Sequence, residues 1–105
     1  MVFARVSSWK YKSGKREEGL KTLNEYVESI PRSQKRFWGG FRGAITLLST
    51  DDPDAALMIT LWESEDALKA SRSDTFKDAV GKIERFLQAA PDVKNYKLDS
   101  AELDI

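Results

Sequence analysis

The stretch that most constrains the fold spans residues 55–86 and reads AALMITLWESEDALKASRSDTFKDAVGKIERF. It begins with an apolar run that ends at Trp62, which is typical of a buried strand. Ser64 and the two acidic residues after it predict a short helix, because a serine oxygen caps the first turn and acidic side chains favour its positive end. Ser73 or Asp74 predicts the start of a longer amphipathic helix. The stretch therefore predicts a strand followed by two helices.

The rest of the chain predicts three more strands. Residues 2–12 alternate in side-chain character and predict the first strand. Residues 37–50 predict the second, with three glycines in its first half that indicate a bulge or a close backbone approach. A polar turn over residues 51–54 joins it to the strand at 55–63, so these two should pair antiparallel. Residues 93–98 predict the last strand.

Residues 15–30 predict a helix, because large aliphatic side chains recur there at three- and four-residue steps. Gly19 costs about 1 kcal/mol relative to alanine inside a helix, and a close approach of helix and sheet is the expected reason for it. The order strand, helix, strand, strand, helix pair, strand is that of an α+β ferredoxin-like domain with a four-stranded antiparallel sheet. We expect the domain over residues 1–98, followed by an acidic tail at 99–105.

A sheet of this kind has helices on one face only. We expect the second face to carry Phe3, Trp9, Met58 and Trp62, which would make it too apolar to remain in water. The same face of a second subunit is the simplest cover. The sequence therefore predicts a homodimer.

Composition narrows the possible chemistry. Seventeen basic and seventeen acidic residues cancel, which argues against nucleic-acid and membrane partners. The chain has no cysteine and no histidine, so it lacks thiolate ligands and the most common metal ligand and general base. Asp51, Asp52 and Asp54 form a carboxylate cluster, but a turn explains them better than a metal site. No membrane span or signal peptide is evident, and we expect a cytoplasmic protein.

Four segments resemble the antibiotic biosynthesis monooxygenase family, whose members form dimeric α/β barrels. The resemblance covers about residues 2–98 and is carried by FARV at 3–6, FRG at 41–43, LWESEDAL at 61–68 and SDTFK at 73–77. It implies the fold and the dimer. It says less about chemistry, because this superfamily includes oxygenases, isomerases, haem-degrading enzymes and proteins with no known activity.

The haem-degrading members resemble the chain through the same helix pair. They carry an asparagine in the first strand, and a tryptophan and a histidine ten residues apart around a Ser-Asp-x-Phe-Lys stretch. This sequence has Ser7, Ala70 and Val80 at those positions. The resemblance therefore does not extend to haem degradation, and we expect no cofactor and no metal.

The cofactor-free quinol-forming oxygenases are the closer comparison. They are similar in having an aromatic pocket between sheet and helices, where an electron-rich phenol supplies the reducing power for oxygen. The resemblance implies a cationic group and a hydrogen-bonding group as catalytic residues, for which Arg5 and Ser7 are the candidates. The candidates for substrate binding are Trp9, Trp38, Arg42, Trp62, Phe76, Phe86 and Tyr96.

Each candidate also has a structural interpretation. Arg5 could form a salt bridge with a neighbouring strand or subunit, and Arg42 could point to water. Trp9 and Trp38 could be anchors of a dimer interface. Trp62, Phe76 and Phe86 could be core residues, and Tyr96 could be an ordinary sheet residue. Two functions therefore stay open. One is a cofactor-independent monooxygenase acting on a quinol-like phenol, and the other is a non-catalytic dimer that binds a small apolar ligand or only itself.

Overall fold

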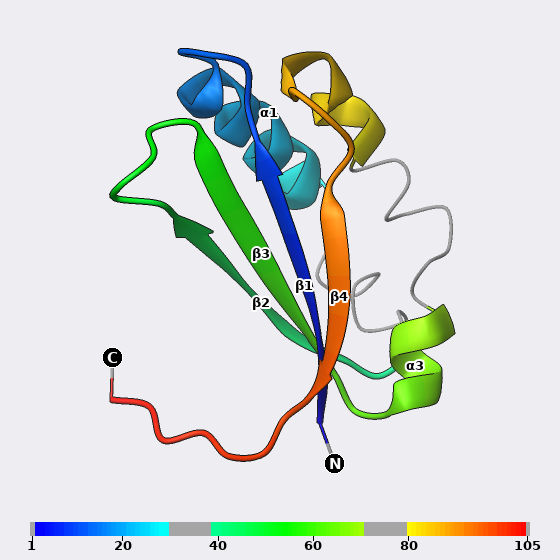
Figure 1. The fold of residues 1–105 in the computed structure, drawn as a ribbon. Helices are drawn as coiled ribbons and strands as arrows, with labels where there is room; N and C mark the ends of the chain where they lie inside the picture. The colour runs from blue at the N-terminus through cyan, green and yellow to red at the C-terminus, as the bar shows by residue number, and fades with distance from the viewer. Residues whose placement is uncertain (1, 30–38, 71–79, 105) are drawn as a thin grey trace.

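A computed structural model describes residues 2–29, 39–70 and 80–104 of the chain. The elements follow the predicted order and confirm the ferredoxin-like α+β fold (Figure 1). The strands and helices are β1 (Phe3–Lys10), α1 (Arg16–Ser29), β2 (Phe41–Leu48), β3 (Ala55–Trp62), α3 (Glu65–Ala70), the 3-10 helix η1 (Glu84–Phe86) and β4 (Asp92–Lys97).

The four strands form one antiparallel sheet in the order β2-β3-β1-β4. In the register of β1 with β3, Arg5 lies opposite Thr60 and Ser7 lies opposite Met58. Because side chains alternate along a strand, the odd residues of β1 and the even residues of β3 share one face. The helices cover this face, because Arg5, Ser7 and Trp9 are buried there and Arg5 contacts α3.

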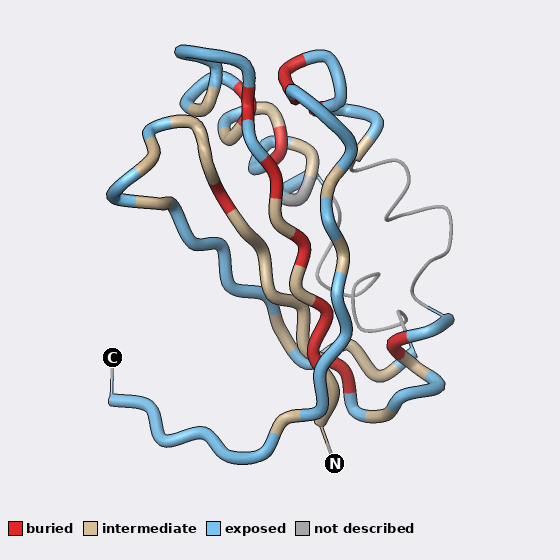
Figure 2. Tube along the Cα trace, in the orientation of Figure 1, coloured by how far each residue is buried: buried red, intermediate tan, exposed pale blue. Residues whose placement is uncertain are grey.

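The core lies between that face and the helical segments, which gather on one side of the sheet (Figure 1). Figure 2 shows buried positions concentrated along β1, while β2 is largely exposed. The main core cluster joins the end of β1 to α1 and to the chain around η1. Its buried members are Trp9, Tyr11, Leu23, Ala56, Ile83, Phe86 and Leu87.

The opposite face of the sheet carries no helix among the described residues. Ile59 lies opposite Val6 on one side and Ile45 on the other, so aliphatic side chains run across three strands. Ile45 and Leu47 are 41% and 47% exposed. An apolar open face was expected from the sequence, and the structure provides one.

The prediction of which residues lie on that open face was wrong. Trp9 and Trp62 are buried on the helix-covered face, and Met58 packs against the core cluster there. Phe3 pairs with Trp62 and shares its face. Both faces of β1 and β3 are apolar, so alternation alone did not tell which one the helices cover.

The element ends differ from the prediction by a few residues. β2 begins at Phe41, after Gly40 with a φ of 86°, and a bulge separates Phe41 from Gly43. The predicted start at residue 37, and the caps at 73 and 74, lie outside the described residues. Residues 80–83 are helical and lead into η1. Ser64 caps α3 as predicted, because its Oγ accepts a 3.1 Å hydrogen bond from the Ala67 N–H.

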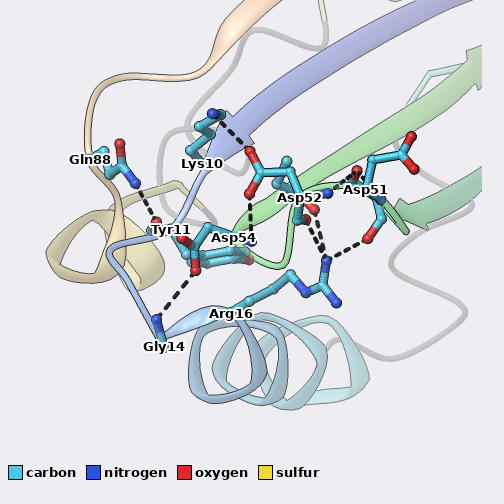
Figure 3. Close-up of polar contacts among 10 residues, drawn as sticks. Lys10, Tyr11, Gly14, Arg16, Asp51, Asp52, Asp54 and Gln88 are labelled. Carbon is cyan, nitrogen blue, oxygen red and sulfur yellow. Dashed lines mark hydrogen bonds and ion pairs between the residues drawn. The ribbon is translucent and has the colours of Figure 1, made fainter.

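The hairpin between β2 and β3 is tied to the start of α1 (Figure 3). Arg16 Nη1 donates to the carbonyl oxygens of Ser49, Asp52 and Ala55, at 2.8, 3.1 and 3.3 Å. Asp54 Oδ1 accepts from the Gly14 N–H at 3.2 Å. These contacts fix one end of the sheet against the helix that covers it.

The end of the chain is exposed. The Leu98 N–H donates to the Val2 carbonyl, and residues 99–104 have no regular secondary structure. Among the described helices, none combines the length and the apolar character needed to cross a membrane.

Candidate functional site

Arg5 lies in the middle of β1, on the helix-covered face, and is only 2% exposed. Its Nη2 donates a 2.7 Å hydrogen bond to the carbonyl oxygen of Leu68 in α3. The last carbonyls of a helix have no partner within it, so this bond satisfies one of them and ties α3 to the sheet. A guanidinium keeps its charge when buried, and Arg5 therefore provides a positive potential beneath the helices.

Ser7 and Trp9 continue the row that Arg5 begins. Both are buried, and both point to the helix-covered face because they alternate with exposed-face residues along β1. The register places Met58 beside Ser7 and Ala56 beside Trp9. Arg5, Ser7 and Trp9 therefore share one face of β1, as alternation along a strand predicts.

Trp62 and Phe86 are buried at opposite ends of the same layer. Trp62 Nε1 donates to Thr60 Oγ1 at 3.0 Å, and its ring meets Phe41 edge-on at 5.3 Å. Phe86 belongs to the core cluster with Trp9, and the Arg85 guanidinium lies 4.4 Å from the centre of its ring. Both side chains are packed as core residues in this chain.

Two candidates do not join the Arg5 row. Tyr96 lies opposite Ala4, which places it on the other face of the sheet, and it is 52% exposed. Arg42 sits in the bulge of β2, where its exposed side chain pairs with Glu63 at 3.1 Å. Trp38 and Phe76 lie outside the described residues.

The acidic turn at residues 51–54 has a structural role. Asp52 pairs with Lys10 at 2.8 Å, and this hydrogen bond, helped by the Asp54 N–H, holds the pKa of Asp52 below its usual value. The same pair raises the pKa of Lys10. Across residues 2–29, 39–70 and 80–104, no group of three acidic, histidine or cysteine side chains is arranged to hold a metal ion.

The sequence interpretation missed Tyr11. Its side chain is fully buried, its ring meets Trp9 edge-on at 6.2 Å between centres, and it packs against Gly19 of α1. Burial raises the pKa of the phenol, and the neighbouring Trp9 indole opposes that shift to a smaller extent. Gly19 was the signal that could have located it, since a glycine inside a helix indicates that something approaches closely.

The sequence matches the model of one protein family. This family is described as "Antibiotic biosynthesis monooxygenase", and the match covers residues 1–82. No curated protein gives a significant match to the sequence.

Solved structures give the same fold. A Bordetella bronchiseptica protein assigned as an antibiotic biosynthesis monooxygenase superposes with a TM-score of 0.73 at 14% identity, over 92% of this chain and 96% of the other. One from Caulobacter crescentus gives 0.71 at 22% identity, over 96% and 91%. SnoaB, a cofactor-independent oxygenase from Streptomyces nogalater, gives 0.71 at 13% identity, over 95% of each chain.

Proposed function

The chain belongs to the antibiotic biosynthesis monooxygenase family, and from that premise we propose that it is a cofactor-independent monooxygenase acting on an aromatic phenol. The observation that carries the proposal is the buried cation of Arg5, in line with Ser7 and Trp9 under the helices. The similarity of fold to SnoaB supports the class of reaction. The substrate class rests on the buried aromatic side chains Trp9 and Trp62 on the same face of the sheet.

The proposed reaction converts a phenol with an unsubstituted para carbon into a quinone. The phenol loses its proton, and the phenolate gives one electron to oxygen. The resulting radical and superoxide join through a new carbon–oxygen bond at the para carbon. The O–O bond then breaks as that carbon loses its hydrogen, and one water leaves. One atom of oxygen ends in the quinone and the other in water, so oxygen is the only oxidant required.

Arg5 and Ser7 have separate roles in this reaction. The Arg5 charge lowers the pKa of a phenol bound beside it and stabilises the phenolate, because a charge acts strongly in a site from which water is excluded. The Ser7 hydroxyl offers a hydrogen bond to the same oxygen. Trp9 supplies an apolar wall. The proton passes to solvent or to a group outside this row.

Oxygen uptake by the purified chain tests the proposal. The assay uses 1-naphthol and 9-anthrone in the presence of EDTA, with an enzyme-free control for spontaneous oxidation. We expect saturable uptake and a quinone product that carries one atom from labelled oxygen. Uptake no faster than the enzyme-free rate with both compounds would contradict the proposal.

Substitution of Arg5 tests its role within the reaction. Arg5→Met removes the charge and should lower kcat/KM at least about tenfold, since losing one electrostatic stabiliser commonly costs that much or more. Arg5→Lys keeps the charge and should retain more activity. Lys69→Met removes an exposed charge and is the control. If Arg5→Met keeps full activity, Arg5 serves only to hold α3.

The open face supports a second part of the proposal, which is self-association. The aliphatic side chains of β2, β3 and β1 on this face form an apolar surface with β3 at its centre. A surface of this kind is typical of an interaction site. We assign it to the same face of a second copy, which would bury both faces at once.

The alternative function is a non-catalytic dimer that binds a small apolar ligand. The contact of Arg5 with Leu68 favours it, because that bond gives the buried charge a structural purpose. The two functions differ in turnover. Binding of 1-naphthol without oxygen uptake would identify the alternative.

A further inference from the structure

Two buried side chains next to each other have polar atoms that make no hydrogen bond. These atoms are the Tyr11 hydroxyl and Trp9 Nε1, and neither has a partner within the described part of the chain. Tyr11 is 0% exposed and Trp9 is 7% exposed. A buried polar atom without a partner destabilises the fold, and phenylalanine would fill the Tyr11 position without that cost. The pair therefore calls for a partner that the described residues do not supply.

The two side chains are held rigidly. The Tyr11 N–H donates to the Asp54 carbonyl at 2.8 Å, and the Tyr11 carbonyl accepts from Gln88 Nε2 at 2.9 Å (Figure 3). Its ring lies where a side chain on residue 19 would be, so only glycine admits it there. The Trp9 ring stands edge-on against it, with an angle of 84° between the ring planes. Groups fixed in this way lose little freedom on binding.

The pair offers donors. The tryptophan N–H can only donate, and burial raises the pKa of Tyr11 so that its phenol stays protonated near neutral pH. The two rings are in contact, with 6.2 Å between their centres. Two neighbouring donors in an apolar layer suit one acceptor oxygen, such as the carbonyl of a quinone or the oxygen of a phenol.

We propose that Tyr11 and Trp9 bind one oxygen of the aromatic ligand, at the end of the site away from Arg5. This inference rests on the proposed function and deepens it. Arg5 and Trp9 are four residues apart in β1, which corresponds to about 13 Å along the strand. A ligand that reaches both ends therefore has two or three fused rings with oxygen atoms at opposite ends. Because the two atoms are covered in the ligand-free chain, binding includes a local opening of that cover.

Titration of the full chain with 2,6-dihydroxynaphthalene and with naphthalene tests this, with ligand fluorescence as the signal. In Tyr11→Phe the ring remains and only the hydroxyl is lost. We expect the Kd of the diol to rise about tenfold, in line with the loss of one buried hydrogen bond, and the Kd of naphthalene to stay the same. Tyr26→Phe, a change on α1, is the control and should leave both unchanged.

Thermal melts of the ligand-free variants give a second reading. Tyr11→Phe should melt at the same temperature as the wild type or higher, because it removes a buried hydroxyl that lacks a partner. A lower melting temperature would overturn the inference, since the hydroxyl would then have a partner in the fold. Equal diol affinity in wild type and Tyr11→Phe would also overturn it, while leaving aromatic binding intact. Failure of the wild type to bind either compound would overturn the inference and the proposed function together.

Discussion

Gly19 is the residue at which helix propensity and packing oppose each other. A Cβ at this position would lie 2.2 Å from Tyr11 Cε1, well inside van der Waals contact. Alanine gains about 1 kcal/mol from helix propensity, but overpacking a rigid core typically costs ~1–3 kcal/mol. We predict that Gly19→Ala lowers the free energy of unfolding by up to about 2 kcal/mol, measured by urea denaturation.

Gly81 is the matched control for that substitution. It is also helical and exposed, and no atom lies within 4 Å of the Cβ that alanine would add. Gly81→Ala should therefore stabilise the chain by up to ~1 kcal/mol. If both substitutions shifted stability in the same direction, the result would contradict the close packing of Tyr11 against Gly19 of α1.

Tyr11 also makes a prediction about alkaline pH. Its folded-state pKa is raised above the ordinary value of 10.0 by burial. The folded state then holds the proton more tightly than the unfolded state, so the stabilising effect is complete below pH 10.0 and is lost as the pH rises through the folded-state pKa. We predict that wild-type stability falls more steeply above that pH than the stability of Tyr11→Phe. Urea melts at a series of pH values would show this, and parallel curves would contradict it.

At the scale of elements, Arg16 joins the β2–β3 hairpin to α1. Its Nη1 is shared among three carbonyl oxygens of residues 49–55. Arg16→Met leaves partly buried carbonyls without that donor, and hydrogen bonds to a charged group contribute about 1.5–3 kcal/mol. We predict a loss of stability in that range by urea denaturation. Lys15→Met removes an exposed ion pair with Glu18 and should change stability by less than ~0.5 kcal/mol. Equal losses would mean that Arg16 does not hold the hairpin.

The sequence predicted the elements better than it predicted their surroundings. The apolar run located β3 almost to the residue, and the Ser64 cap located the start of α3. The covered face was misassigned because β3 is apolar on both sides, and only the packing of α1 and α3 distinguishes them. Tyr96 was grouped with Arg5 because the sequence does not show the register of β4 with β1. That register pairs Tyr96 with Ala4, on the opposite face from Arg5. The row of Arg5, Ser7 and Trp9 was predictable, since it depends on alternation within one strand.

The two faces of the sheet carry different side chains, and we expect them to have different roles, ligand binding on one and self-association on the other. The helix-covered face holds the buried charge and the unpaired donors of Trp9 and Tyr11. The open face presents aliphatic side chains, and Ile45 and Leu47 are exposed there. The helices cover one face, and we expect a second copy of the chain to cover the open apolar face. A domain of this size also gains stability from a partner, because it buries a modest share of its unfolded surface.

The molar mass in solution, measured by static light scattering over a range of concentrations, tests this division most directly. We predict about twice the 11.9 kDa of one chain for the wild type. Ile45→Lys should give the mass of a single folded chain, because it places a charge within the proposed apolar interface, whereas Thr50→Lys in the exposed hairpin loop should remain a dimer. A wild-type protein that stays folded at the mass of one chain would contradict the account.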